Sequence, residues 1–220
     1  MRIGIDAHII LPQHKRYNPK IARYTEQLID HLVGSEEGER HTWILFFDER
    51  TKDLPCLEKY KKLKNVEVKK FPFVQYRQYL PVVYSHMLIS GFLVSAKLDV
   101  FHSPEGLIPF MYPGKIITDF FYVPRGVGES GLFSRTFMLG ARVAFSQLCR
   151  RARRIIVNTA ADKKILVEKW KYPEHRATLI EEEDIARADW PKRVQRLMGV
   201  YKEVVEEKTK PKQVVEKAKK

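Results

Sequence analysis

Short apolar runs alternate with helical segments about six times along this chain, and this order constrains the fold more than any other feature. The apolar runs, which we read as strands, cover residues 2–9, 42–48, 65–71, 98–103, 113–118, 153–158 and 176–181. Helical patterns lie between and after them, over residues 20–32, 52–63, 78–96, 132–152, 159–170 and 189–208. Strands that alternate with helices in this way form a parallel sheet with helices on both faces. We therefore predict an α/β fold with a single doubly wound, Rossmann-like domain.

The charge of the chain predicts an anionic partner. Its 220 residues carry a formal net charge of +13, and residues 181–220 hold 11 basic and 9 acidic side chains. The body of the protein therefore carries most of the excess, so this is a basic domain and not a neutral one with a basic arm. Nucleic acid, lipid headgroups and phosphorylated substrates are the classes that such a charge attracts.

Cysteine usage and the N-terminus predict a cytoplasmic protein. Cys56 and Cys149 are far apart and show no metal-ligand spacing, which is typical of reduced thiols. The opening MRIGIDAHII is too short and too polar for a secretory signal. The uncharged residues 78–96 approach the length needed to span a membrane, but Pro81 and Gly91 make them less suitable as a transmembrane helix. We favour a buried or half-buried helix there over interfacial membrane contact or a true span.

Ligands of doubly wound sheets gather at the carboxyl ends of the strands, so candidate site residues are sought there. His102 ends a strand and suits a base or an anion ligand, although its spacing alone favours a structural imidazole bonded to the loop backbone. Thr159 precedes a helix whose N-terminus suits a phosphate, and simple capping with Asp162 is the alternative. Lys20 and Arg23 stand in the first helical turns, either to meet an anion or as a solvated face.

Motifs for cofactor, metal or covalent chemistry do not occur. The sequence has no GxGxxG, P-loop, HExxH or nucleophile elbow, so we expect no cofactor and no metal. Asp6 and His8 with Asp119 imitate a triad, but no Ser or Cys has a matching context. The arginines of 150–154 lie at a helix end, where they complement the helix dipole. They are not interleaved with the aromatic residues on which the bases of a single strand would stack. Nucleic acid is therefore not the expected partner.

Several segments carry a family resemblance. They are MRIGIDAH at 1–8, IARYTEQLIDHL at 21–32, HTWILFF at 41–47, LDVFHSPEGLIPFMYPGKIIT at 98–118 and RRARRIIVNTAADKKILVEKWKYPEHRATLI at 150–180. Together they resemble the N-terminal, acceptor-side domain of the family-4 glycosyltransferases, which have the GT-B fold. The resemblance covers most of residues 1–180. It implies that the chain forms one lobe of a two-lobe sugar-transferring enzyme.

The chain departs from this family after residue 180. Family members continue into a second Rossmann domain that binds the sugar nucleotide, whereas here EEEDIA leads to a helix beginning near Trp190. That helix resembles the family's last helix, which packs back on the acceptor domain. The resemblance thus implies an acceptor-side domain over 1–181, a linker with the returning helix over 182–208, and a basic flexible tail over 209–220.

Two motifs near the family's reaction site are also replaced. The family's glycine-rich turn reads Asn18-Pro19-Lys20 here, so the glycines that let a ligand approach the backbone are lost. Phe120 and Phe121 stand in place of the family's His-Asp pair, and Asp119 lies one residue before that pair. A Phe side chain cannot carry a proton. These losses favour a truncated lobe, or pseudoenzyme, that is not catalytic alone.

The resemblance supplies the remaining expectations about site and partners. His102 and Asp119 are the weak catalytic candidates. Acceptor or phosphate binding is expected of Lys20, Arg23, His102, Ser103, Glu105, Arg125 and Thr159. The lobe would act as a scaffold or acceptor-binding subunit, or complete a site with a donor-lobe chain or a further copy of itself.

Two alternatives stay open. The first is an active minimal glycosyltransferase with a reorganised pocket around His102, Glu105 and Asp119. The second is a basic module at the inner membrane surface, which would bind anionic lipid or a lipid-linked acceptor. Its expected membrane-facing residues are Lys61, Lys62, Lys64, Tyr76, Arg77 and Tyr79.

Overall fold

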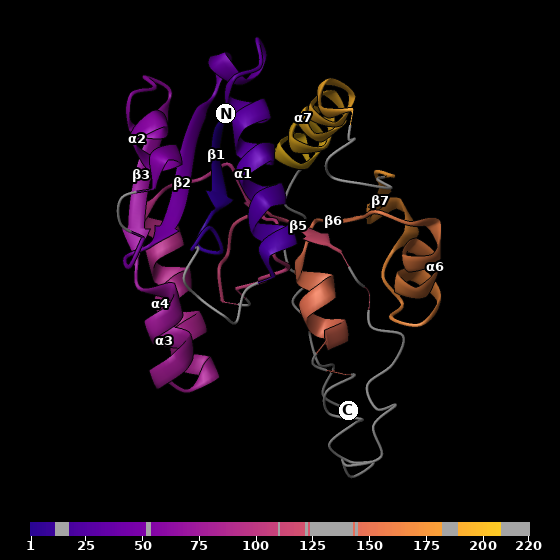
Figure 1. Cartoon of the computed structure of the whole chain (residues 1–220). Coiled ribbons are helices and arrows are strands. Elements are labelled where there is room, and N and C mark those ends of the chain that lie inside the picture. The colour runs from indigo at the N-terminus through magenta and orange to yellow at the C-terminus, as the bar shows by residue number, and fades with distance from the viewer. Residues whose placement is uncertain are drawn as a thin grey trace.

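The computed structural model describes residues 1–11, 18–51, 54–109, 111–121, 123, 143, 145–181 and 189–207 (Figure 1). Within this part of the chain, seven parallel strands form one sheet in the order β3-β2-β1-β4-β5-β6-β7. The strands are β1 (Arg2–Asp6), β2 (Thr42–Asp48), β3 (Val66–Phe71), β4 (Val100–Ser103), β5 (Ile116–Phe120), β6 (Arg154–Val157) and β7 (Ala177–Leu179). The predicted doubly wound, Rossmann-like α/β fold is confirmed.

The central strands are apolar along their whole length because both faces of the sheet are covered. Every residue of β2 after Thr42 is buried, and all of β4, β5 and β6 is buried. The close packing behind β1 requires Gly4, since a Cβ there would lie 2.5 Å from Leu98 Cδ1. The sheet therefore forms the rigid centre on which the loops at its carboxyl edge are held.

Helices cover the two faces of the sheet separately. Cores form against α1 (Pro19–Val33), α2 (Pro55–Lys61) and α7 (Trp190–Glu206) on one face. On the other, α3 (Phe73–Tyr79), α4 (Val82–Ser95), a helix at 145–151 and α6 (Ala160–Glu168) contribute. Short 3₁₀ turns, η1 (Gly38–Arg40) and η2 (Glu174–Arg176), precede β2 and β7. Most of the helix predicted over 132–152 lies outside the described residues.

Local signals explain where the first and last helices begin. Asn18 caps α1 by accepting a hydrogen bond from the Lys20 backbone, and Pro19 occupies the first turn. Asp189 caps α7 in the same way through the Lys192 backbone, 3.2 Å away. Both helices begin where the sequence predicts them.

The uncharged stretch at 78–96 does not form one helix, so that prediction is wrong in this respect. Helix α3 ends at Tyr79, Leu80 is extended with φ −108° and ψ 147°, and α4 begins after Pro81. The proline ring excludes the helical conformation for the residue before it, which breaks the helix. Helix α4 is half-buried: Ile89 and Leu93 reach the core, while Tyr84 is 57% exposed. No helix in the described segments is long and apolar enough to cross a bilayer.

The C-terminal helix α7 returns to the sheet and lies beside α1 (Figure 1). It buries Leu197, Met198, Tyr201 and Val204. At its start, the Trp190 ring stacks on the His31 ring with centroids 4.9 Å apart. At its end, Arg154 Nη1 forms an ion pair of 2.6 Å with Glu207 Oε1. Apolar packing and polar contacts at both ends therefore hold this distant segment against the first part of the fold.

Candidate functional site

The strand order reverses between β1 and β4, and this crossover positions the candidate site. Strand β1 pairs with β2 on one side and with β4 on the other, so the segments after β1 and β4 leave the sheet together. Those segments begin at Asp6 and Ser103 and carry His8 and Glu105. Crevices of doubly wound sheets form at such switch points, which makes this the default binding position in the fold.

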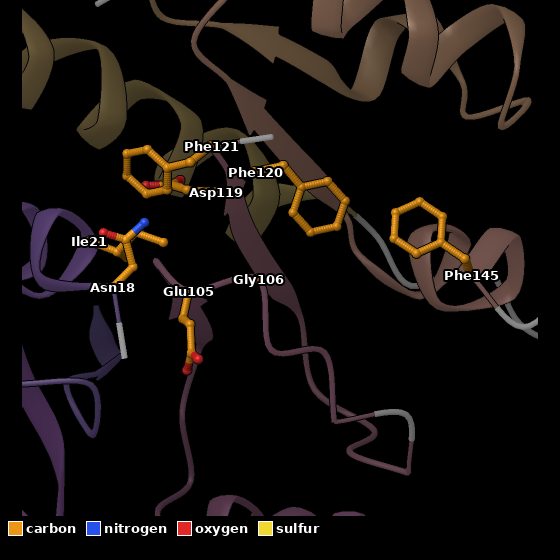
Figure 2. Close-up of a pocket in the computed structure, with 8 residues that line it drawn as sticks. All are labelled: Asn18, Ile21, Glu105, Gly106, Asp119, Phe120, Phe121 and Phe145. Carbon is orange, nitrogen blue, oxygen red and sulfur yellow. The ribbon is translucent and has the colours of Figure 1, made fainter. Parts of the chain in front are cut away.

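A pocket of about 380 Å³ lies at this edge (Figure 2). It is lined by Asn18, Ile21, Glu105, Gly106, Asp119, Phe120, Phe121 and Phe145. Its polar groups are thus two carboxyls and one amide, and aromatic rings supply most of the remaining wall. None of these lining residues is cationic. The described part of the lining therefore suits hydrogen-bond donors and flat apolar faces.

A second hollow of about 240 Å³ shares four of these residues, Glu105, Gly106, Phe120 and Phe145. It adds His86 from α4 together with Leu107, Ile108 and Leu148. Glu105 therefore lines both hollows. Helix α4 therefore contributes to the same crevice as the loop after β4.

Glycine is required at position 106 of this crevice. Gly106 has φ +89°, a conformation that L side chains rarely adopt. A Cβ there would also lie 3.1 Å from the Phe120 ring. The turn after Glu105 can therefore fold back against Phe120 only without a side chain.

A buried histidine supports Glu105 from behind. His8 Nε2 lies 2.8 Å from Glu105 Oε2, and His8 Nδ1 contacts Asp6 Oδ1. The hydroxyl of Ser103 donates to the other oxygen of Asp6 over 3.3 Å, and the Phe73 ring stacks on the imidazole at 4.9 Å. His8 itself has no solvent exposure, whereas the side chain of Glu105 is 18% exposed. The imidazole thus bridges a buried carboxylate and one that faces the pocket.

The two carboxylates keep His8 protonated. Burial alone disfavours the imidazolium, but the charge and hydrogen bond of Asp6, together with those of Glu105, raise the pKa of His8 to about 10. Protonated on both nitrogens, the ring donates to each carboxylate and cannot act as a base. Ser103 bonds to Asp6 and not to the imidazole, so this arrangement does not activate its hydroxyl.

The same three residues form the one group in the described segments with metal-ligand chemistry. One ligand atom from each of Asp6, His8 and Glu105 lies within 4.8 Å of the others. Both ring nitrogens, however, already contact carboxylate oxygens. A metal ion would have to displace the proton between Nε2 and Glu105, so the geometry fits a proton-bridged clamp better than a metal centre.

A second buried network holds Asp119. Asp119 Oδ1 lies 3.0 Å from His102 Nε2, and Oδ2 accepts a 2.7 Å hydrogen bond from the Tyr24 hydroxyl. His102 Nδ1 lies 2.6 Å from the Tyr201 hydroxyl, and Arg193 Nη2 donates to Tyr24 over 2.6 Å. All five side chains are at least 96% buried. Burial next to Asp119 raises the pKa values of Tyr24 and Tyr201 well above the ordinary value, so both remain hydroxyl donors.

This network sets the roles of the two weak catalytic candidates. His102 has no exposed surface, and its two nitrogens contact the side chains of Tyr201 and Asp119, not the loop backbone that the structural alternative assigned to it. Asp119 reaches the pocket wall but is only 1% exposed, with both oxygens bonded. The network ties α1, β4 and β5 to α7, which makes it primarily a connection between distant elements.

The other expected binding residues are spread more widely. Ser103 is buried, and its hydroxyl accepts from the Leu107 backbone over 3.0 Å. Lys20 and Arg23 are exposed on α1 and are not among the lining residues. Thr159 accepts from the Asp162 backbone over 3.0 Å, so the predicted helix cap is present. Glu105 is thus the expected residue that the structure places most openly in the crevice. Arg125 lies outside the described residues.

The expected membrane-facing residues lie at opposite ends of strand β3. Lys61, Lys62 and Lys64 are exposed around the end of α2, before β3 begins. Tyr76 and Tyr79 belong to α3, after β3 ends. The six residues of β3 separate the two groups by about 20 Å. The side chain of Arg77, also on α3, is outside the described part.

Sequence reasoning did not find Asn18, Ile21 and Phe145 as pocket residues or Tyr24, Tyr201 and Arg193 as network members. The helical periodicity of α1 marks Tyr24 only as a core position. Arg193 and Tyr201 follow the helical pattern of α7 and carry no motif. One signal was available: a tyrosine or arginine on the buried stripe of a helix needs a buried polar partner.

Comparisons with known proteins support the fold. No family model matches the chain, and no curated protein matches it. A sucrose-phosphate synthase chain from Thermosynechococcus elongatus, designated as two separate stretches of that protein, is similar with a TM-score of 0.55 and 11% identity. The match covers 92% of this chain and 98% of that one. At this identity the likeness shows a shared fold and nothing further about this chain.

Two further solved structures are similar at lower scores. A glycosyltransferase from Rickettsia africae has a TM-score of 0.49 and 13% identity, over 91% of this chain and 49% of that one. This chain therefore spans about half the length of that glycosyltransferase. A hydrogenase maturation factor from Archaeoglobus fulgidus has a TM-score of 0.38 and 12% identity, over 91% and 89%. Since both scores lie below 0.5, the shared fold rests on the synthase match.

Proposed function

We propose that this chain is a glycosyltransferase-related, acceptor-side lobe that holds an acceptor in the crossover pocket and receives the donor site from another chain. The observation that carries this proposal is the position and chemistry of the 380 Å³ pocket. It opens at the carboxyl edge of a sheet whose fold is shared with part of a sucrose-phosphate synthase. The family resemblance of residues 1–180 points in the same direction.

The lining of the pocket suits a hydroxylated acceptor. Carboxylate oxygens accept hydrogen bonds from hydroxyls, and aromatic rings pack against the apolar faces of sugar-like rings. Glu105 supplies the most accessible carboxylate, and Phe120, Phe121 and Phe145 supply the rings. A volume of about 380 Å³ accommodates one or two such rings.

The same lining gives little support for a donor. Transfer from a nucleotide sugar needs the diphosphate leaving group to be oriented and its charge neutralised. The residues known to line the pocket include no cation, and His102 is buried with both nitrogens engaged. We therefore assign donor binding and catalysis to a partner lobe rather than to this chain alone.

Calorimetry and NMR test whether this chain binds the acceptor and not the donor. The full chain is titrated with uridine and guanosine diphosphate sugars, and separately with a panel of mono- and disaccharides followed by ¹⁵N-edited NMR. We expect no heat from the sugar nucleotides and saccharide-induced shifts at the Gly106 and Phe121 amides. Micromolar binding of a sugar nucleotide would overturn the proposal in favour of a minimal complete enzyme. Copurification with a second Rossmann-type chain would support it.

A second candidate function, contact with a lipid surface, rests on the outer face of α3 and α4. Tyr79, Val83, Tyr84 and Met87 are 75%, 59%, 57% and 44% exposed, and α4 carries no formal charge. Exposed apolar patches of this kind mark interaction surfaces, and aromatic residues suit the headgroup region. Helix α4 also supplies His86 to the second hollow, so a membrane on this face would lie next to the crevice.

Vesicle flotation tests the lipid contact. The full chain is mixed with vesicles of mixed anionic and zwitterionic lipid at moderate salt. We expect flotation that is reduced by the double variant Tyr84→Ser, Met87→Ser and retained by Val143→Ser, a matched change at a 54% exposed position elsewhere. Absence of flotation, or flotation that the double variant leaves unchanged, would rule out this face as the contact.

A further inference from the structure

One buried tyrosine joins the wall of the crossover pocket to the C-terminal helix. Tyr24 lies on α1 with no exposed surface, and its hydroxyl donates to Asp119 Oδ2 over 2.7 Å. Its ring meets the Phe121 ring edge to face, with centroids 4.7 Å apart. Asp119 and Phe121 both line the pocket, whereas Tyr24 does not (Figure 2). A side chain outside the lining therefore contacts two residues of the pocket wall.

Helix α7 holds the same tyrosine from the other side. Arg193 Nη2 and Nε donate to the Tyr24 hydroxyl over 2.6 and 3.2 Å, and the guanidinium carbon lies 4.9 Å from the centre of the ring. The Trp190 ring lies 5.9 Å from the Tyr24 ring. Trp190 and Arg193 belong to the first turn of α7. Tyr24 is thus fixed by a segment 169 residues away in the sequence.

We infer that Tyr24 is a positioning residue of the crossover pocket, which holds Asp119 and Phe121 in the pocket wall and is itself held by helix α7. This inference rests on the proposed acceptor function, and it adds α7 to the acceptor site. A ligand in the pocket then meets a wall whose geometry is set partly from the last helix of the fold.

The hydrogen bonds give this arrangement a direction. A guanidinium can only donate, so the oxygen of Tyr24 accepts from Arg193 and its proton is directed to Asp119. The second oxygen of Asp119 lies 3.0 Å from His102 Nε2, so the carboxylate is held at both oxygens. Loss of the Tyr24 contact would let the carboxylate turn. A wall that turns has to be ordered again at each binding event, which weakens binding.

Ring packing provides a second route from α7 to the wall. The edge-to-face contact fixes the angle between the rings of Tyr24 and Phe121, which is 80° here. On the α7 side, the Trp190 ring packs both on Tyr24 and on the His31 ring. A shift of the first turn of α7 would therefore move the Tyr24 ring and, with it, the ring of Phe121.

The first measurement needs no ligand and compares two arginines of α7 in the full chain. Arg193→Met removes the donors to Tyr24, and Arg196→Met removes the same charge from an exposed position. We expect Arg193→Met to shift the NMR signals of the Phe121 ring and of the Asp119 carboxyl carbon. Arg196→Met should leave these signals in place. Wall signals that stay in place in Arg193→Met, or that respond equally to both variants, would overturn the inference.

A double-mutant cycle then shows whether the effect passes through Tyr24. Tyr24→Phe removes the hydroxyl that accepts from Arg193 and keeps the ring. We expect Arg193→Met to shift Phe121 much less when Tyr24→Phe is already present than in the wild type. An equal shift in both backgrounds would show that α7 reaches the wall by another route and would overturn the inference. If Arg193→Met does not fold, Arg193→Lys takes its place in both comparisons, with Arg196→Lys as its control.

The last measurement connects the wall to binding. The wild type, Tyr24→Phe and the control Tyr60→Phe are titrated with glucose and with maltose, and the Gly106 and Phe121 amides are followed by NMR. Tyr60 donates to Asp30 over the same 2.7 Å, and neither of these two residues lines the pocket. We expect binding to weaken about fivefold in Tyr24→Phe and to stay unchanged in Tyr60→Phe.

The outcomes separate the two proposals. Equal saccharide binding by the wild type and by Tyr24→Phe would overturn the inference and leave the acceptor function standing. Absence of saccharide binding by the wild type would overturn the acceptor function. The comparison of the arginine variants, which needs no ligand, would then still decide whether α7 positions the pocket wall through Tyr24.

Discussion

Two buried histidines stand at the ends of adjacent strands, and they are used differently. His8 follows β1 and His102 lies in β4, both have no exposed surface, and each contacts a carboxylate with Nε2. The partner of His8 is Glu105, which is partly exposed in the crevice. The partner of His102 is Asp119, which is 1% exposed. The carboxylate bound to His8 therefore lines a pocket, whereas the one bound to His102 lies in the interior.

The difference lies in what the second nitrogen meets. His8 Nδ1 contacts another carboxylate, Asp6, so the ring is held as a cation between two anions. His102 Nδ1 meets the hydroxyl of Tyr201 on α7, so the ring joins β4 to a helix 99 residues away in the sequence. The first arrangement holds a charge at a binding edge, and the second holds the fold together. Four predictions test this division.

At neutral pH, the largest loss of stability from removing one charge in the His102 network is expected from Asp119→Asn. The change leaves the buried Arg193, Tyr24 and His102 without the carboxylate that all of them are organised around. We expect the free energy of unfolding to fall by about 3 kcal/mol in urea denaturation. Asp189→Asn, at the exposed cap of α7, should cost less than about 1 kcal/mol. Equal costs for the two variants would contradict a structural role for the contact between His102 and Asp119.

The pH dependence of stability should come from His8 and its two carboxylate partners, Asp6 and Glu105. Because the folded pKa of His8 is raised to about 10, its stabilisation is complete below the unfolded pKa near 6.5 and is lost as pH rises through 10. Among the described residues, Asp6 and Glu105 contact the ring nitrogens and Phe73 lies on the ring face.

We expect this loss to reach about 1.4 kcal/mol per pH unit between these values, measured by urea denaturation across the range. His8→Gln should lack that slope, and the difference between the two profiles removes the common titration of lysines and tyrosines. Parallel profiles for wild type and His8→Gln would show that His8 is neutral in the folded protein.

An intermediate effect is expected from Tyr201→Phe. Only the hydroxyl that contacts His102 Nδ1 is removed, and the ring can keep its packing against Trp43. We expect a loss of about 1–2 kcal/mol and faster hydrogen exchange along α7 than along α6. Tyr172→Phe, whose hydroxyl donates to the Ala152 carbonyl, serves as a control that should leave exchange in α7 unchanged. Unchanged exchange in Tyr201→Phe would remove His102 from the connection to α7.

The smallest effect on stability is expected from Glu105→Gln. The side chain is partly exposed, and the amide can still accept a hydrogen bond from His8. We expect the free energy of unfolding to change by less than about 1 kcal/mol. A loss as large as that of Asp119→Asn would mean that the contact between His8 and Glu105 is also structural.

The fold followed from the sequence because its signals are local. Apolar runs such as 42–48 and caps such as Asn18 act within a few residues, and they predict elements and their order. One local signal was misjudged: Pro81 breaks a stretch that its lack of charge made look continuous. Glu105 and Asp119 were also identified, since they follow or end predicted strands at the carboxyl edge.

Only the tertiary structure decided what those residues do. The sequence by itself determined a doubly wound sheet, a C-terminal helix and a basic overall charge, because periodicity, caps and composition are properties of neighbouring residues. The return of that helix to the sheet was implied only by the family resemblance. The roles of His8 and His102 depend on partners 97 and 99 positions away, and no pattern along the chain records such contacts. The same reason separates the charge of the protein from that of its pocket. A sum over 220 residues gives +13, whereas the pocket contains the few that folding brings together.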